Sequence, residues 1–177
     1  MLKNMYNKQK FANNISMDKH KGNWLVEALV IIGGTLLLGG IATLLGGQIF
    51  NFEQYEMPAG VVPKIVFPIC WAIIYLAIGV STFLVWRDKE IKRINRKTDV
   101  IWFAIHMFFN IIWPLLFFRL GWILVACIDL LLTVITAIIV MYRYYDSNLP
   151  AGIIFTIYTA WLLYAMYLNL GIVILNM

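Results

Sequence analysis

Residues 151–175 read AGIIFTIYTAWLLYAMYLNLGIVIL, an apolar run without a charged side chain. At 1.5 Å per residue, a helix of about 20 such residues crosses the hydrocarbon core of a bilayer. Two side chains in the run are not explained by contact with lipid. Trp161 is one, since tryptophan prefers the membrane interfaces, and Asn169 is the other, since an amide at this depth needs a hydrogen-bond partner. The stretch predicts a transmembrane helix with one face turned toward other helices.

The whole chain has the composition of this stretch. Of its 177 residues, 62% are hydrophobic and only 13% are charged, and the mean hydropathy is +0.81. Soluble domains carry about 25% charged residues, so an integral membrane protein of one compact unit is expected. The two cysteines, Cys70 and Cys127, lie in apolar runs and match no metal-binding spacing. We interpret them as small packing residues.

Four further apolar runs precede this one. Together they give five predicted spans, at about residues 24–49, 62–86, 100–118, 122–142 and 151–175. Because backbone polar groups in lipid must be satisfied internally, only helices and closed barrels span membranes, and the short alternating strands of a barrel are not seen. We predict an all-α integral membrane protein, a bundle of five transmembrane helices over residues 23–177, preceded by a polar, disordered tail over residues 1–22.

Positive charges gather on one side of the predicted spans. All but two of the 14 lysines and arginines lie in the tail or in the loops after the second and fourth spans, and the exceptions are Lys64 and Arg119. The positive-inside rule therefore places the N-terminus in the cytoplasm and the C-terminus outside, in what we expect to be a bacterial cytoplasmic membrane. Since the net charge of +5 follows the loops, no nucleic acid partner is expected. The basic second loop is also compatible with docking of an anionic lipid.

Polar and aromatic side chains recur at helical spacing in three of the spans. The stripes are Phe67, Trp71, Tyr75 and Gly79 in the second span; His106, Asn110, Trp113 and Phe117 in the third; and Trp161, Ala165, Leu168 and Asn169 in the fifth. Residues three or four apart share a helix face, and polar groups at membrane depth usually face the bundle. The three faces either converge on a flat ligand site or form a space-filling core in which Asn110 bonds Asn169.

The first span and the loop after it carry two further features. A small residue recurs at every fourth position of the span, at Thr35, Gly39, Thr43 and Gly47. Such a stripe allows close helix approach, either inside the bundle or between two copies of the chain. The loop over about residues 50–61 is the longest connection on the outer side. It could cover the mouth of a cavity as a lid.

Asp129 is the one acid well inside a predicted span, with Thr133 and Thr136 nearby. A carboxyl group at this depth serves either proton or cation coupling in a transporter or a structural role as a hydrogen-bonded group. His106 lacks the partner ligands of a metal site, so a buried structural role is favoured over haem ligation and no metal site is expected. No nucleophile–base arrangement stands out, so these residues predict no enzyme activity of their own.

Three blocks of sequence carry a resemblance to a known family. They are MPAGVVPKIVFPICWAIIYLAIG at 57–79, HMFFNIIWPLLFF at 106–118 and YTAWLLYAMYLNLGIVILN at 158–176. The blocks contain the patterns F-x-x-x-W-x-x-x-Y-x-x-x-G, N-x-x-W and W-x-x-x-A-x-x-L-N, in that order. Over about residues 24–177 the chain resembles the TspO/MBR family of bacterial tryptophan-rich sensory proteins and the mitochondrial translocator protein, also called the peripheral benzodiazepine receptor.

The chain departs from the family pattern at several positions. The family's loop tryptophan is replaced by Gly60 and its lysine by Met57. The glutamine that stands four residues before Asn110 in the family is His106 here. No basic residue follows Tyr167, so the cholesterol motif of the animal members is not supported in this chain.

The resemblance implies five tightly packed helices around a pocket that opens toward the first loop, and a homodimer. It implies a membrane receptor or sensor that binds protoporphyrin IX, a haem-related tetrapyrrole or another flat hydrophobic ligand, acts in tetrapyrrole or stress responses, and requires no cofactor. Two alternatives come from the same family: light- and oxygen-dependent porphyrin breakdown that uses Trp71 and Trp161, and transport of a tetrapyrrole or other small molecule. The residues expected at the ligand are Phe67, Trp71, Tyr75, His106, Asn110, Trp113, Phe117, Tyr158, Trp161, Ala165 and Leu168.

Overall fold

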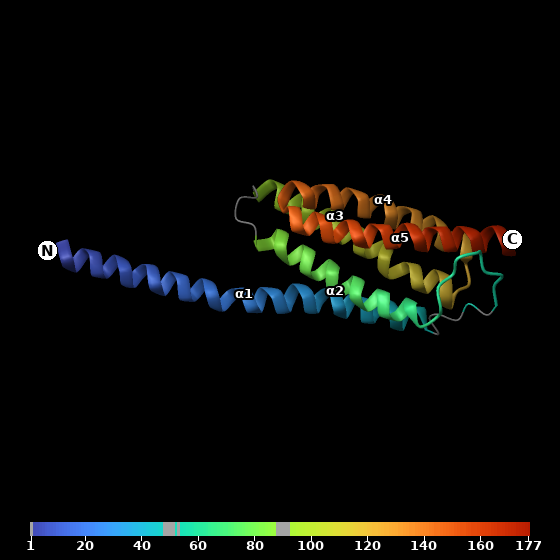
Figure 1. The fold of residues 1–177 in the computed structure, drawn as a ribbon, viewed down its shortest axis with the longest axis horizontal. Helices are drawn as coiled ribbons and strands as arrows, with labels where there is room; N and C mark the ends of the chain where they lie inside the picture. The colour runs from blue at the N-terminus through green and yellow to red at the C-terminus, as the bar shows by residue number, and fades with distance from the viewer. Residues whose placement is uncertain (1, 48–51, 53, 88–92) are drawn as a thin grey trace.

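The computed structural model describes residues 2–47, 52, 54–87 and 93–177. Its elements are α1 (Leu2–Gly46), α2 (Val66–Arg87), α3 (Arg93–Pro114), the π-helical segment η1 (Leu115–Arg119), α4 (Ile123–Ser147) and α5 (Leu149–Asn176) (Figure 1). Five stretches are long and apolar enough to cross a membrane: Trp24–Gly46, Val66–Arg87, Arg96–Arg119, Ile123–Ser147 and Leu149–Asn176. The predicted all-helical membrane bundle with five spans is confirmed.

Several predicted span boundaries shift for local reasons. The helix α2 starts at Val66 instead of residue 62, after a turn in which the Val66 N–H donates to the Pro63 carbonyl at 2.9 Å. The helix α4 continues to Ser147, five residues beyond the predicted end, because its last turns bury Tyr144. The helix α5 begins at Leu149, and the Asn148 side chain caps it by accepting the Ala151 N–H. The predicted end of the first span, at residue 49, lies outside the described residues.

The N-terminal part of α1 covers the segment for which the sequence predicts a disordered tail. The structure continues α1 through residues 2–22 as a helix, and Figure 1 shows it projecting far beyond the bundle. This segment contains no proline, so nothing in it breaks a helix that starts in the adjacent span. Its polar composition provides no apolar stripe to pack against the bundle. The start of the transmembrane domain at residue 23 stays a prediction.

The five long helices close into a ring in the order α1, α2, α5, α4, α3. The contact between α1 and α2 is especially close, because a Cβ atom placed on Gly39 would lie 2.6 Å from the Tyr75 ring. A Cβ atom on Gly79 would likewise lie 2.9 Å from the backbone of Ile32. The small residues of the first span thus pack against α2 of the same chain, as expected for close helix approach inside a bundle.

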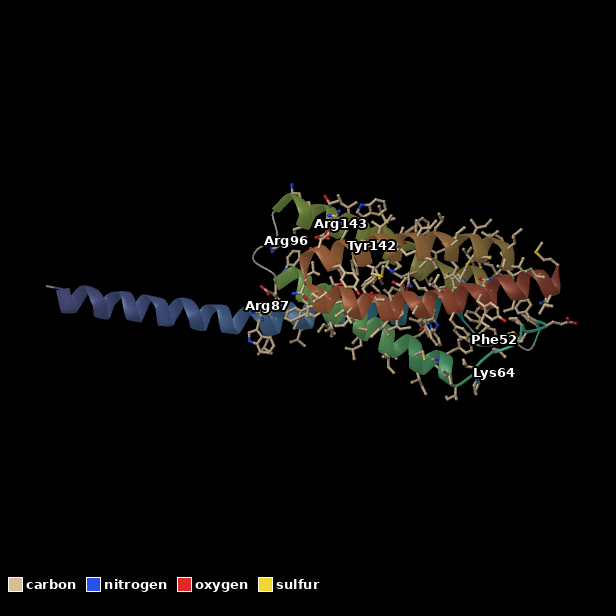
Figure 2. The ribbon with its side chains drawn as sticks, turned by 45° about the horizontal axis from the view of Figure 1, so that its top comes forward. Phe52, Lys64, Arg87, Arg96, Tyr142 and Arg143 are labelled. Carbon is tan, nitrogen blue, oxygen red and sulfur yellow. The ribbon has the colours of Figure 1, made fainter. Side chains whose placement is uncertain are left out.

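The two ends of the bundle differ in charge. Figure 2 shows Arg87, Arg96 and Arg143 at one end, and Phe52 with Lys64 at the other. The first end is the one from which the N-terminal part of α1 projects. Lys89 and Lys92 of the basic second loop lie outside the described residues. This arrangement agrees with the charge asymmetry in the sequence, and the orientation of the protein in its membrane stays a prediction.

Candidate ligand-binding site

An aromatic cluster lies where α2, α3 and α5 meet near the end of the bundle that carries the first loop. The rings of Trp71 and Trp113 stack with centroids 6.0 Å apart and planes 28° apart, and Trp113 stacks on Phe117 at 5.3 Å. Phe67 meets Trp161 edge to face at 6.1 Å. Offset and edge-to-face pairs of this kind contribute about 0.5–1.5 kcal/mol each beyond burial. The three predicted stripes therefore converge on one aromatic cluster.

The turn after Pro114 determines how many rings the third span adds to the cluster. Pro114 ends α3, and the wider π-helical turn of η1 follows, in which the Leu120 N–H donates to the Leu115 carbonyl at 3.0 Å. In this wide turn both Phe117 and Phe118 contact Trp113, with centroids at 5.3 and 5.6 Å. Regular helical spacing predicts only Phe117 on this face.

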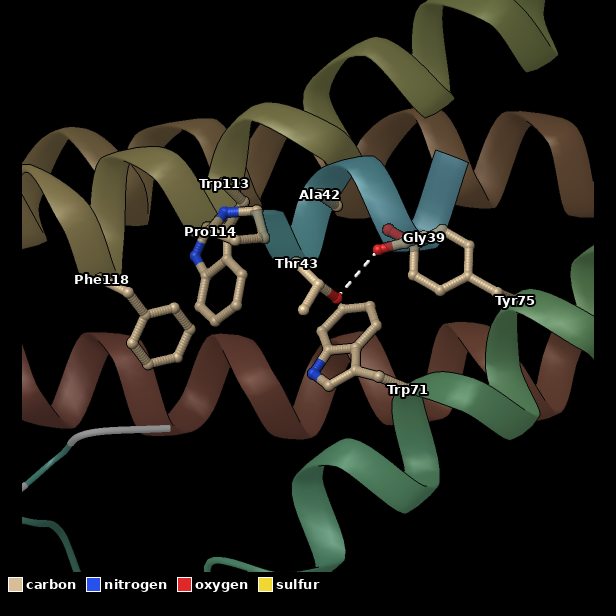
Figure 3. Close-up of a pocket in the computed structure, with 8 residues that line it drawn as sticks. All are labelled: Gly39, Ala42, Thr43, Trp71, Tyr75, Trp113, Pro114 and Phe118. Atoms are coloured by element: carbon tan, nitrogen blue, oxygen red, sulfur yellow. Dashed lines mark hydrogen bonds between the residues drawn. The ribbon is translucent and has the colours of Figure 1, made fainter. Parts of the chain in front are cut away.

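Two cavities lie against the cluster, each with about 320 Å³ of empty space. The α5 cavity is lined by Phe52, Phe67, Trp71, Trp113, Phe117, Trp161, Ala165, Leu168, Asn169 and Ile172. The α1 cavity is lined by Gly39, Ala42, Thr43, Trp71, Tyr75, Trp113, Pro114 and Phe118 (Figure 3). Trp71 and Trp113 line both cavities, so their stacked rings form the partition between them.

Phe52, from the first loop, inserts its side chain into this cluster. Its ring lies 5.0 Å from that of Phe67 and 5.4 Å from that of Phe118, and the residue is only 7% exposed. Because Phe52 lines the α5 cavity, the loop closes this cavity with a side chain that fills part of it. Helical periodicity does not extend to loop residues, and no sequence signal singled out Phe52.

Two tyrosines of α5 hold the first loop in this position. The Tyr164 hydroxyl donates to the Gly60 carbonyl at 3.1 Å and accepts the Val62 N–H at 3.0 Å. The Tyr167 hydroxyl donates to the Ala59 carbonyl at 2.8 Å. These contacts attach the loop backbone to α5, and the role of the loop as a lid stays a prediction.

The end of α5 adds a second attachment to the same loop. The Asn176 amide donates to the Glu56 carbonyl at 3.0 Å and accepts the Glu56 N–H at 2.9 Å. Gly171 provides the space for this close approach, since a Cβ atom there would lie 2.7 Å from the Pro58 ring. We call the contacts of Tyr164, Tyr167 and Asn176 with the loop the α5 clasp.

The two tryptophans that face each other across the α5 cavity differ in their hydrogen bonding. The Trp113 Nε1–H donates to Asn169 Oδ1 at 3.0 Å, and Asn169 Nδ2 donates to the Ile123 carbonyl at 3.1 Å. Asn169 thus makes the expected interhelical bonds, but the proposed Asn110–Asn169 pair is wrong. The Trp161 Nε1 is buried and has no hydrogen-bond partner among the described residues. The Trp161 N–H is therefore a hydrogen-bond donor at the wall of the α5 cavity that no described residue uses.

The remaining polar candidates form a buried chain of hydrogen bonds beside the cavities. Tyr75 donates to Asn110 Oδ1 at 2.6 Å, and Asn110 Nδ2 donates to the Tyr158 hydroxyl at 2.8 Å. The Tyr158 hydroxyl lies 2.9 Å from His106 Nε2, and His106 Nδ1 lies 3.1 Å from Thr136 Oγ1. Both ring nitrogens of His106 are therefore engaged, which leaves neither for an iron atom. These groups satisfy one another, and of them Tyr75 alone lines one of the two aromatic cavities.

The predicted ligand residues thus separate into three groups. Those that line the α5 cavity are Phe67, Trp71, Trp113, Phe117, Trp161, Ala165 and Leu168. Tyr75 lines the α1 cavity, whereas His106, Asn110 and Tyr158 belong to the buried polar chain. The lining residues that the sequence analysis missed include Phe52 and Ile172. Ile172 continues the stripe of Trp161, Ala165 and Leu168 by one further turn, so the spacing could have identified it.

The acidic and metal-ligating side chains of the described residues form no metal site beside the aromatic cavities. Within the described ranges, no group of three or more His, Cys, Asp or Glu side chains could hold a metal ion. Asp129 is buried in α4, and its Oδ2 has no hydrogen-bond partner in the described part of the chain. It does not line either aromatic cavity.

Comparison with known proteins agrees with this arrangement. The chain is 29% identical to a translocator protein of Bos taurus over 147 residues, which is 77% of this chain and 84% of the relative. It is 28% identical to a tryptophan-rich protein TspO of Chlorobaculum tepidum over 118 residues, covering 64% of this chain and 72% of the relative. A tryptophan-rich protein TspO of Archaeoglobus fulgidus is 28% identical over 126 residues, 71% of this chain and 79% of its own length. Residues 27–175 match the TspO/MBR family, and the chain belongs to that family.

Proposed function

We propose that this protein is a membrane receptor or sensor that binds a flat tetrapyrrole such as protoporphyrin IX in the α5 cavity. The observation that supports it best is the buried Trp161 Nε1, which has no hydrogen-bond partner in the described part of the chain and lies in a wall made mostly of rings and aliphatic groups. An unpaired donor in an apolar setting costs free energy, which an acceptor on a ligand would recover. The side-chain carboxylates of a porphyrin carry such acceptors, and its macrocycle matches the aromatic walls.

The walls of the α5 cavity indicate how the ligand would enter. Phe52 fills part of this cavity, and the rings of Trp71 and Trp113 separate it from the α1 cavity. A macrocycle needs more room, and two movements would supply it. Phe52 would leave with the loop, and the partition formed by Trp71 and Trp113 would shift to join the α5 cavity to the α1 cavity. In this mechanism the α5 clasp sets how readily the site opens.

Titration of the purified protein with protoporphyrin IX, followed by quenching of tryptophan fluorescence, tests the proposal. Trp161→Phe keeps a ring but removes the N–H, so we expect affinity to fall about 2- to 13-fold, the worth of a hydrogen bond of about 0.5–1.5 kcal/mol. Trp122→Phe is the matched control, because Trp122 is exposed and lies outside the cavity. Unchanged affinity in both Trp113→Ala and Trp161→Ala would exclude this cavity as the site.

Three tryptophans around one cavity also favour a second candidate, light- and oxygen-dependent breakdown of the bound porphyrin. Trp71, Trp113 and Trp161 all line the α5 cavity, where each could give an electron to an excited macrocycle. Illumination of the complex in air, followed through the Soret band, tests this activity. Bleaching that persists at the original rate in Trp71→Phe and Trp161→Phe would argue against a role for the tryptophans. Loss of bleaching with retained binding would support it.

The same proposal includes the membrane setting. The concentration of Arg87, Arg96 and Arg143 at one end supports an N-terminus in the bacterial cytoplasm. Cysteine labelling of the exposed Leu175→Cys and Asp146→Cys positions in intact cells would test this orientation, with only the former expected to react from outside. The family resemblance supports a homodimer, which light scattering of the detergent-solubilised protein would detect.

A further inference from the structure

We propose that the bundle holds a second binding site, at the end opposite Phe52, for the phosphoethanolamine headgroup of a membrane lipid. The site is a cavity with about 290 Å³ of empty space between α2, α3 and α4. Its lining includes Trp86, Arg96, Asp99, Phe103 and Tyr144. Figure 2 shows Arg96 at the opposite end of the molecule from Phe52, so this site is separate from the aromatic cavities.

The hydrogen bonding of the Asp99 carboxylate indicates which chemical group the ligand must carry. Asp99 is only 6% exposed, and its Oδ1 accepts a hydrogen bond from Arg143 Nε at 2.6 Å. Its Oδ2 is buried and has no hydrogen-bond partner among the described residues. A buried carboxylate oxygen without a partner is costly. A cationic donor is the strongest partner for such an oxygen.

The hydroxyl groups of Thr82 and Tyr144, which line the cavity, also favour a ligand that donates hydrogen bonds. Thr82 donates its hydroxyl hydrogen to the Ile78 carbonyl at 2.8 Å. The 3.0 Å contact between Thr82 and Tyr144 therefore uses the Tyr144 hydrogen. Both hydroxyl oxygens keep only acceptor capacity toward a ligand. A primary ammonium has three N–H donors, whereas a hydroxyl has one and a quaternary ammonium has none.

Arg96 provides the complementary charge for a phosphate. Its guanidinium lies over the Trp86 ring at 5.4 Å from the centroid, which orients its planar face. Arg96 and Asp99 are three residues apart on α3, so their side chains are neighbours with Cβ atoms about 5–6 Å apart. A ligand with a phosphate close to an ammonium group matches this pair, and guanidinium groups bind phosphate through two parallel hydrogen bonds.

The position of the cavity favours a lipid as the source of this headgroup. Arg96 begins the third candidate span and Arg87 ends the second, so the cavity lies at the level where lipid headgroups meet the protein. Val85, Val100 and Phe103 form its apolar wall, which would receive the first part of the acyl chains. A charged pair next to an apolar wall is the chemistry of a phospholipid at the edge of the bilayer.

Native mass spectrometry of the delipidated full chain, with lipids of identical acyl chains added back, tests the site. We expect phosphatidylethanolamine to bind about tenfold more tightly than phosphatidylcholine or phosphatidylglycerol, as a charged hydrogen bond would provide. Asp99→Asn should abolish this preference. Asp146→Asn, which removes an exposed acid from the same end of α4, should keep it. Equal binding of the three lipids to the unaltered protein would overturn the proposal.

A second variant keeps the test decisive if Asp99→Asn fails to fold, since that change also removes the ion pair with Arg143. Arg96→Gln leaves the Asp99–Arg143 pair in place and should weaken phosphatidylethanolamine and phosphatidylcholine alike. Unchanged binding of both lipids in Arg96→Gln would overturn the proposal. Free phosphoethanolamine separates the two sources of the headgroup. Failure to displace the lipid at micromolar concentration supports a lipid site, and displacement would assign the cavity to a soluble metabolite instead.

Discussion

The indole rings of Trp71 and Trp113 stack at 6.0 Å, and this pair forms the wall between two cavities. The two rings are not held equally. Trp113 is buried and bonded to Asn169, whereas Trp71 is half-buried. We infer that Trp113 is the fixed side of the partition and that Trp71 is the side that moves when a large ligand enters.

Replacement of Trp71 should therefore weaken binding more than it weakens the fold. We expect Trp71→Leu to lower affinity for protoporphyrin IX about 2- to 13-fold, because one ring contact contributes about 0.5–1.5 kcal/mol. Fluorescence titration measures the change, with Trp122→Leu as the control at an exposed position. A variant that binds as well as the unaltered protein would show that Trp71 is not part of the site.

Filling part of the α5 cavity with a larger side chain should also lower the affinity for protoporphyrin IX. Ala165 lines the cavity beside Trp161, so a leucine there adds three carbon atoms to the space that a ligand needs. We expect Ala165→Leu to reduce affinity about fivefold or more, since overpacking costs about 1–3 kcal/mol. Ala160→Leu, on the exposed face of the same helix, should bind normally. The same titration compares the two, and equal loss in both would point to a general disturbance of α5.

Much of this arrangement follows from patterns in the sequence. Hydropathy predicts all five spans, because lipid imposes a length and a composition on any helix that crosses it. Spacing at i, i+4 and i+7 predicts that Trp71, Trp113 and Trp161 face the interior, because helical geometry fixes which residues share a face. These rules are local, so they hold before any tertiary contact is known.

Other features depend on contacts that spacing cannot encode. Phe52 lies in a loop, where no period relates one side chain to the next, and Phe118 joins the cluster only because a π-helical turn follows Pro114. The placement of His106 and Asn110 illustrates a second limit. Their stripe correctly predicts an inward face, but whether an inward polar group meets a ligand or another side chain depends on neighbours from α2, α4 and α5.

We expect the buried hydrogen bonds that join Asn110, Tyr158 and His106 to stabilise the fold and not to contribute to ligand binding. Tyr158→Phe removes the hydroxyl that joins Asn110 to His106 and leaves both without this partner. Interhelical hydrogen bonds in membrane proteins are worth about 0.6 kcal/mol on average and up to about 1.7 kcal/mol. We expect the midpoint of thermal unfolding in detergent to fall by a few degrees while porphyrin affinity holds. Lost affinity with an unchanged midpoint would instead place Tyr158 at the ligand.

Loosening the α5 clasp should change the rates of binding more than the affinity. The double variant Tyr164→Phe with Tyr167→Phe removes the hydroxyls that hold Gly60, Val62 and Ala59. Each such bond contributes about 0.5–1.5 kcal/mol, so we expect entry and release of protoporphyrin IX to accelerate several-fold in stopped-flow quenching. Tyr142→Phe, at the exposed opposite end of the bundle, is the control. Unaltered rates in the double variant would mean that opening of the loop does not limit entry.

Replacement of Asp129 should have different effects in a receptor and in a transporter that is coupled to a proton or cation. Its Oδ2 is buried without a partner in the described ranges, and it lines neither aromatic cavity. A carboxylate at membrane depth is costly, by about 2.5–3.5 kcal/mol on insertion scales. Asparagine has the same shape and no charge, so we expect Asp129→Asn to keep porphyrin affinity and to hold or raise the thermal midpoint. Porphyrin flux in proteoliposomes should then be the same with and without the substitution. If flux is lost while binding is retained, the carboxyl group couples transport to a proton or cation, and the receptor proposal must give way to a transporter.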